Sequence, residues 1–102
     1  MKKLDVLGLK TTIKIKKSDD ENAIAEWDHE LNLITIDPED TEKFHSLCHE
    51  LAHVVWHRSG MHQAINNEQL EEMHSENWAN VLNENFIKLY QMYTKLNAKR
   101  RK

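Results

Sequence analysis

The segment HSLCHELAHVVWH, residues 45–57, decides the fold that we expect for this chain and raises the question of its chemistry. Apolar side chains recur at helical spacing around it, from Phe44 through Leu51 to Val55, so the segment predicts an amphipathic helix. Its centre, HELAH, carries two histidines four positions apart. The segment is therefore either a metal site built on one helix or a helix that is merely rich in imidazole.

The residues before this helix predict a small β-sheet. Residues 11–17 alternate β-branched or apolar residues with lysine, which is the two-residue period of a half-exposed strand. Residues 23–28 and 31–37 predict a hairpin around the turn DHE, and residues 18–22 form the polar turn before it. The two isoleucines of the second hairpin strand, Ile34 and Ile36, share one face of the sheet.

Capping residues suggest where the helices begin and end. Asp37 is expected to cap the motif helix, with the only proline in its first turn, and Gly60 is expected to end it. Asn66 or Asn67 can cap a second helix over residues 68–98, whose main stripe comprises Trp78, Leu82, Asn85, Leu89, Tyr93 and Leu96. The expected fold class is α+β, with an N-terminal antiparallel sheet of about three strands, the motif helix and a long C-terminal helix.

The HELAH motif places metal ligands and a base on one rigid element. On a helix, residues four positions apart differ by about 40° around the axis and about 6 Å along it. His49 and His53 can therefore direct both imidazoles at one point, which suits tetrahedral Zn²⁺. Glu50 lies one position further round, where it can contact a water on the metal without joining the ligands. Zinc lowers the pKa of such a water, and an adjacent carboxylate can take its proton.

A third protein ligand is required, and spacing alone does not select it. A metzincin-type motif would continue with histidine where this chain has Ser59, which excludes that class. His45 and His57 extend the motif face and either line the site or are solvated, and we expect both to be solvated bystanders. His29 and His62 are weaker candidates. The second helix carries four alternatives, which are Glu71, Glu72, His74 and Glu76.

Composition narrows the class of protein. The length of 102 residues predicts one domain over residues 1–102. A net charge of −3 and a pI near 6.1 give no reason to expect nucleic-acid binding. Cys48, the single cysteine, excludes an internal disulfide framework, and we expect it to be a small core residue. No apolar stretch reaches the length of a membrane span, so we expect a cytoplasmic protein. If the motif is that of a peptidase, the expected partner is a protein or peptide substrate.

The order of these parts resembles the ImmA/IrrE-type metallopeptidases, especially the compact versions found in phages and mobile elements. The resemblance rests on a hairpin followed by LCHELAHVVWH and then ENWANVL, and it covers residues 23–82. In that family the third ligand is a glutamate that opens an E-x-x-A-N-like stretch, which ENWAN matches. The resemblance therefore implies a zincin-like fold, with His49, His53 and Glu76 as zinc ligands and Glu50 as the base. After this segment the chain departs from the family pattern and reads NENFIKLYQMY.

Two functions of different classes fit these residues. The first is a zinc-dependent metallopeptidase that hydrolyses a peptide bond in one specific intracellular protein, with Glu50 activating the attacking water. The alternative is a non-catalytic, zinc-stabilised binding or inhibitor protein that acts by docking to a host or phage protein. A third function, an interaction protein without metal, requires the motif to be accidental. Zincins pair an extended substrate with the edge strand beside the metal helix, and residues 31–37 are the candidate strand.

Overall fold

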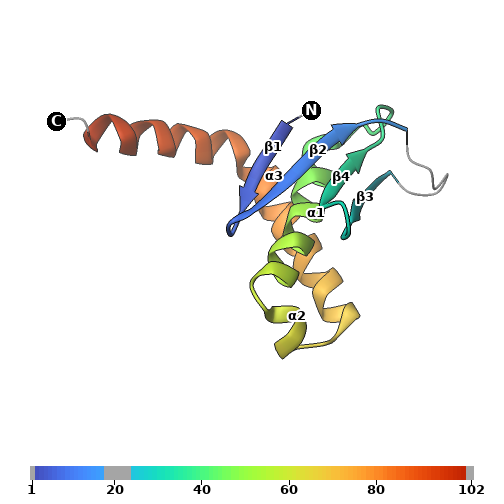
Figure 1. The fold of residues 1–102 in the computed structure, drawn as a ribbon. Helices are drawn as coiled ribbons and strands as arrows, with labels where there is room; N and C mark the ends of the chain where they lie inside the picture. The colour runs from blue at the N-terminus through green and yellow to red at the C-terminus, as the bar shows by residue number, and fades with distance from the viewer. Residues whose placement is uncertain (1, 18–23, 101–102) are drawn as a thin grey trace.

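The computed structural model describes residues 2–17 and 24–100, with side chains through residue 98, and these form an α+β fold. The sheet lies against α1, and α3 runs along α1 before its C-terminal half extends away from the other elements (Figure 1). None of the described helices combines the length and apolar character that a membrane span requires. The elements are β1 (Lys2–Val6), β2 (Leu9–Ile15), β3 (Ala25–Asp28), β4 (Leu33–Ile36), α1 (Lys43–Arg58), α2 (Met61–Ala64) and α3 (Glu68–Arg100).

The described strands form one mixed sheet in the order β1-β2-β4-β3. β4 is antiparallel to β3 and parallel to β2, with Ile13 opposite Ile34 in the parallel pair. The β1–β2 hairpin closes through Leu7, with φ of 52°, and Gly8, with φ of 87°. Two consecutive positive φ values are typical of the hairpin turn whose twist matches that of the strands. The Asp5 carboxylate accepts a hydrogen bond from the Gly8 amide at 2.8 Å and secures this turn.

The sheet differs from our expectation of a smaller, antiparallel one. β1 is an additional strand that was not predicted, because its first four residues are all exposed. Without alternation between buried and exposed positions, a strand lacks its main sequence signal. The prediction that residues 31–37 form an edge strand is wrong, because β4 lies between β2 and β3. β3 holds that edge of the sheet instead, and the turn predicted at residues 18–22 lies outside the described residues.

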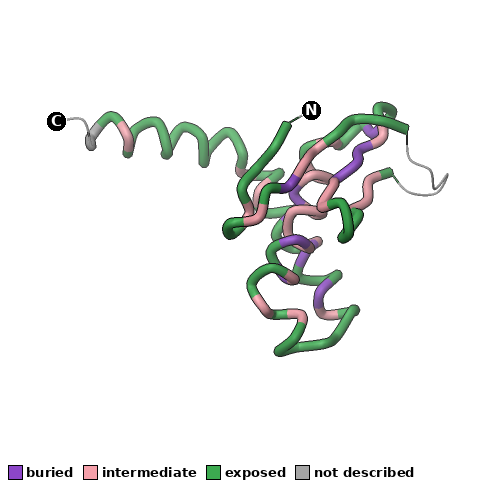
Figure 2. Tube along the Cα trace, viewed as in Figure 1, coloured by how far each residue is buried: buried purple, intermediate pink, exposed green. Residues whose placement is uncertain are grey.

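The hydrophobic core lies where β4 faces α1. Ile34 and Ile36 are 0% and 3% exposed and pack against Val54, which is 0% exposed. In Figure 2 buried segments lie in the sheet and on α1, and further buried segments lie where α1 runs along α3. Burial of a side chain such as Ile34 contributes roughly 1.5–3 kcal/mol, so these contacts fix α1 against the sheet. The residues packed around this cluster are Val6, Ile13, Ala25, Trp27, Leu47 and Leu51.

α1 begins later than the capping pattern predicted. Asp37 does not cap the helix, because its carboxylate accepts the Glu39 amide at 2.8 Å and closes a turn. Asp40 accepts the Glu42 amide at 2.7 Å in the same way. Such local bonds from aspartate to the backbone compete with a helical start. The helix therefore begins at Lys43.

The other helix boundaries follow the sequence more closely. α1 ends at Arg58, and Gly60 adopts the left-handed conformation with φ of 89°, as expected for a residue that terminates a helix. The bridging segment that follows contains the short helix α2. The Asn67 side chain accepts a hydrogen bond from the Leu70 amide at 3.0 Å, so Asn67 caps α3.

The two halves of α3 differ in burial. Ser75 and Ala79 are 0% exposed in the N-terminal half, whereas Tyr93 and Leu96 of the predicted stripe are 64% and 61% exposed. α1 begins opposite the middle of α3, where the Phe44 ring contacts that of Phe86, and the residues of α3 beyond that point are almost all exposed (Figure 2). Trp78, the first member of the stripe, is itself 49% exposed. The helical period therefore predicted the helix correctly, but it did not predict how much of the stripe is buried.

Candidate metal centre

Histidines of α1 and glutamates of α3 form an alternating array between the two helices. The histidines occupy successive turns of α1, and each glutamate contacts two of them, in an order that shows the helices to be antiparallel. The four imidazoles are partly buried, with side chains between 17% and 23% exposed. We call this array the His–Glu ladder, and its members in spatial order are His45, Glu76, His49, Glu72, His53, Glu71 and His57.

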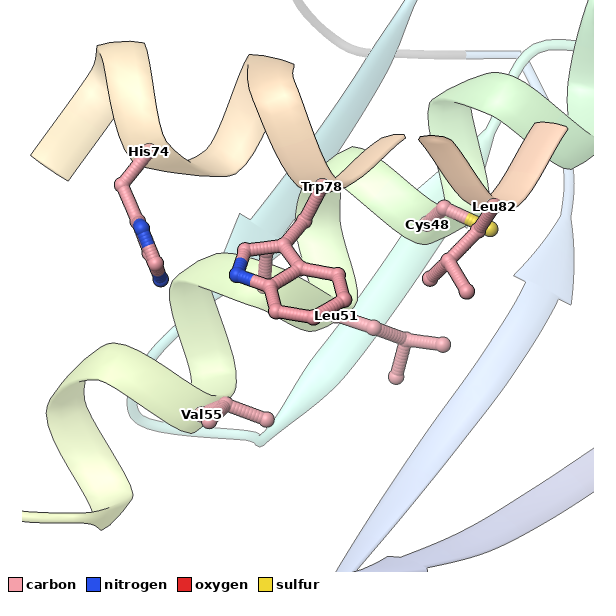
Figure 3. Close-up of a pocket in the computed structure, with 7 residues that line it drawn as sticks. Cys48, Leu51, Val55, His74, Trp78 and Leu82 are labelled. Atoms are coloured by element: carbon pink, nitrogen blue, oxygen red, sulfur yellow. The ribbon is translucent and has the colours of Figure 1, made fainter. Parts of the chain in front are cut away.

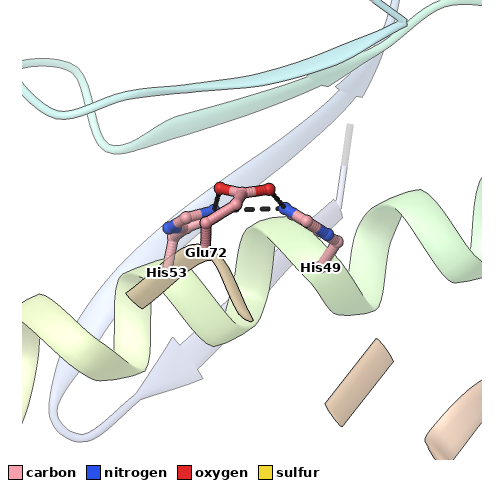
Figure 4. A group of neighbouring side chains, drawn as sticks. All are labelled: His49, His53 and Glu72. Carbon is pink, nitrogen blue, oxygen red and sulfur yellow. Dashed lines mark hydrogen bonds and ion pairs between the residues drawn. The ribbon is translucent and has the colours of Figure 1, made fainter. Parts of the chain in front are cut away.

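The centre of the ladder brings two imidazole nitrogens and a carboxylate together. The Nε2 atoms of His49 and His53 lie 3.2 Å apart. The Glu72 carboxylate faces both rings, with Oε1 at 2.8 Å from Nε2 of His49 and Oε2 at 3.1 Å from Nε2 of His53 (Figure 4). These three side chains form one of the groups of the described residues that are close enough to bind a metal ion.

Two further carboxylates hold the opposite nitrogens of these rings. His49 Nδ1 lies 2.7 Å from Oε2 of Glu76, and His53 Nδ1 lies 2.6 Å from Oε2 of Glu71. An ionised carboxylate only accepts hydrogen bonds, so both Nδ1 atoms donate. A neutral imidazole has a single N–H group. In a ring with that single N–H group on Nδ1, Nε2 keeps a lone pair, and both Nε2 atoms face each other and Glu72.

This arrangement needs a positive charge at its centre. Two bare nitrogens and a carboxylate repel one another unless a cation or additional protons lie between them. In a tetrahedral zinc site with zinc–nitrogen distances of about 2.0–2.1 Å, neighbouring ligand atoms are separated by about 3.3 Å. The observed nitrogen–nitrogen separation of 3.2 Å agrees with that value. Carboxylates on the outer nitrogens are also the usual partners of metal-ligating histidines, so the residues fit a metal ion.

The glutamate that lies beside both motif imidazoles differs from the third ligand implied by the family resemblance. We expected Glu76 beside His49 and His53, but Glu72 occupies that position, and Glu76 contacts the opposite nitrogen of His49. Glu71, another alternative, occupies the corresponding outer position on His53. The structure thus brings together all the acidic candidates from the second helix, but in different roles.

The flanking histidines are not solvated bystanders, and that prediction is wrong. His45 Nε2 lies 3.1 Å from Oε1 of Glu76 and 2.9 Å from the side-chain oxygen of Asn80. His57 Nε2 lies 3.1 Å from Oε2 of Glu71. Both rings therefore extend the ladder by one contact at each end. The four-residue spacing of the histidines was the signal that could have revealed this.

Glu50 lies beside the centre of the ladder. Burial raises the pKa of Glu50, whereas the nearby imidazoles of His53 and His49 lower it in part. The side chain lines a hollow of about 450 Å³ between α1 and the start of β3, together with His49 and Glu76. A carboxylate that binds a proton more tightly is a better general base near neutral pH. The hollow leaves space for a reacting group next to this carboxylate.

An apolar pocket lies between α1 and α3, apart from the ladder. It has a volume of about 230 Å³, and the Trp78 ring lies across it toward Leu51 and Val55 (Figure 3). His74, the remaining alternative ligand, lines this pocket and shares no contact with the two motif imidazoles in the described part of the chain. Cys48 also borders the pocket and is 5% exposed, which confirms its prediction as a core residue, and burial raises the pKa of its thiol.

Comparison with known proteins assigns this chain to no family. No protein-family model matches the chain, and no curated protein or solved structure is significantly similar to it. The resemblance to ImmA/IrrE-type metallopeptidases therefore depends on the motif residues alone. The functional argument that follows depends on the contacts of the His–Glu ladder.

Proposed function

We propose that this protein is a zinc-dependent metallopeptidase with a zincin-like, ImmA/IrrE-type active site, and that His49, His53 and Glu72 are its zinc ligands. The observation that carries the proposal is the pair of Nε2 atoms 3.2 Å apart, both facing Glu72, with a second carboxylate at Nδ1 of each ring. Two histidines and one glutamate leave a fourth coordination position open, as catalytic zinc sites do. Glu72 thereby takes the role that the family resemblance assigned to Glu76.

The chain's own residues have separate tasks in this proposal. When bound, zinc supplies Lewis acidity that activates water and polarises a peptide carbonyl. Glu76 and Glu71 hold the rings of His49 and His53 in the orientation that directs Nε2 inward. Glu50 accepts the proton of the attacking water and passes it to the leaving amine. Its raised pKa, caused mainly by burial, favours that proton transfer.

The edge of the sheet supports binding of an extended substrate. Among the described strands, β3 pairs only with β4 and contacts α1. An extended peptide segment that adds to β3 would run past the hollow lined by Ala25, His49 and Glu50. We propose, from the family resemblance, that the substrate is one specific intracellular protein, and the four-residue edge strand β3 suits recognition of a short extended segment.

The test is the Glu50→Gln variant, compared with wild type and with Glu84→Gln, an exposed substitution on α3 outside the ladder. Each form is expressed in cells, and new protein N-termini are identified by mass spectrometry. We expect wild type and Glu84→Gln to generate the same cleavage product, and Glu50→Gln to lose it while retaining zinc. Removal of a general base typically reduces the rate by about 10²–10⁴-fold, which is well within reach of this measurement.

The same experiment separates catalysis from docking. If wild type and Glu50→Gln both bind zinc but neither produces a cleaved protein, the peptidase proposal fails and a zinc-stabilised binding protein remains. If purified wild type binds no zinc, both functions fail together.

A further inference from the structure

We infer that the end of the His–Glu ladder forms a second divalent-metal site, with His57, His62 and Glu71 as its ligands. The ligand atoms of these three residues lie within 4.8 Å of one another. They come from the last turn of α1, from α2 and from the first turn of α3, so the site would join the ends of three helices. The proposed peptidase site uses none of them as a ligand, and the second site can exist without it.

The turn between α1 and α2 positions the two imidazoles. Gly60, in the left-handed conformation, reverses the chain after α1. This reversal returns the His62 ring over the His57 ring, with centroids 4.2 Å apart and planes inclined by 27°. His57 Nε2 also lies 3.1 Å from Oε2 of Glu71. Two stacked rings and a carboxylate thus meet at one point of the surface.

The charge balance around Glu71 favours a metal ion. Glu71 is 8% exposed, and its ion-pair partners among the described residues are the imidazoles of His53 and His57, with no lysine or arginine. A nearly buried carboxylate requires a compensating positive charge. A divalent cation held by His57, His62 and Glu71 would supply that charge.

The donor set identifies the chemical class of the ion. Imidazole nitrogens with a carboxylate oxygen suit zinc and neighbouring transition metals better than magnesium or calcium, which prefer oxygen ligands alone. Oε2 of Glu71 contacts both His57 and His53. If the proposed function is correct, an ion in the second site also fixes the carboxylate that orients His53.

The experiment counts zinc ions on the full chain. Protein stripped with a chelator is reloaded with zinc alone, passed through a desalting column and assayed for zinc by elemental analysis. The variants are His62→Ala, His49→Ala, the double variant, and His74→Ala as a histidine control outside both groups. We expect about two equivalents for wild type and His74→Ala, about one for each single variant, and almost none for the double variant. Circular dichroism melting shows that each protein is folded.

The outcomes distinguish the two sites. If His62→Ala retains as much zinc as wild type, the second site is overturned, whatever happens at His49. If His62→Ala loses one equivalent and His49→Ala loses none, the second site stands and the proposed peptidase site fails. Wild type that binds no zinc overturns both.

Glu71→Gln tests the coupling between the sites. We expect this variant to lose the second equivalent and to bind the remaining zinc about 10–100-fold more weakly, the usual effect of removing the carboxylate behind a metal-ligating histidine. Affinity is measured by competition with a chromophoric chelator. Unchanged affinity for the remaining zinc would overturn the coupling but not the second site.

Discussion

Glu72 and Glu76 lie one turn apart on α3, and each contacts two histidines of α1. Replacing each by alanine tests which glutamate binds zinc and which one only orients a histidine that binds zinc. The structure places Glu72 against the Nε2 atoms of His49 and His53, whereas Glu76 contacts Nδ1 of His49 and Nε2 of His45. Loss of a carboxylate that supports a ligating histidine typically weakens metal binding by about 10–100-fold, or about 1.4–2.8 kcal/mol. Loss of one of only three protein ligands must cost more than this.

The weaker zinc binding of each variant also lowers the free energy of unfolding that zinc contributes. At free zinc about 100-fold above the wild-type Kd, binding stabilises the fold by about 2.7 kcal/mol. A Glu76→Ala protein that binds about 30-fold more weakly keeps about 0.9 kcal/mol of this at the same zinc concentration. Glu72→Ala, weakened by more than about 100-fold, keeps less than about 0.4 kcal/mol.

The assay is urea unfolding of each variant with and without zinc, in a His62→Ala background so that the second site contributes nothing. The difference between the two curves cancels any effect of the substitution on the metal-free fold, and Glu84→Ala serves as the control. A larger loss of zinc stabilisation in Glu76→Ala than in Glu72→Ala would refute our assignment and restore Glu76 as the ligand.

Three further predictions concern the fold, and each is measured as a free energy of unfolding in urea without metal. Ile34→Ala, at a side chain that is 0% exposed, should cost about 2–5 kcal/mol, because it leaves a cavity between β4 and α1. Asn67→Ala should cost about 1 kcal/mol, because the Leu70 amide loses its acceptor, and Asn67→Ser should recover most of that loss. Leu96→Ala, at a side chain that is 61% exposed, should change stability by less than about 0.5 kcal/mol, and a larger loss would reveal contacts that this structure lacks.

The fold was predictable where local signals are strong. The helical period of the motif segment, the turn at Gly60 and the cap at Asn67 all act within a few residues, and each appears in the structure. β1 was not predictable from alternation, because its side chains are almost all exposed. The parallel pairing of β2 with β4 depends on how the chain returns after β2, which no local pattern specifies.

The candidate site was predictable in its motif but not in its register. His49, His53 and Glu50 follow from a spacing within one helix. The choice between Glu72 and Glu76 depends on how far α3 is shifted along α1, and one turn of shift, about 5.4 Å, exchanges the two residues. Contacts between distant residues set that shift, such as the rings of Phe44 and Phe86 with centroids 4.8 Å apart. A single sequence does not encode this register in any local pattern.

Nitrogen-15 NMR of the imidazole side chains tests the central claim most directly, because it reports which ring nitrogen carries hydrogen and which binds metal. On addition of zinc, we predict that His49 and His53 keep hydrogen on Nδ1 and bind the ion through Nε2, while His74 is unaffected. Zinc that leaves both Nε2 signals unchanged, or that binds through Nδ1, would contradict the account.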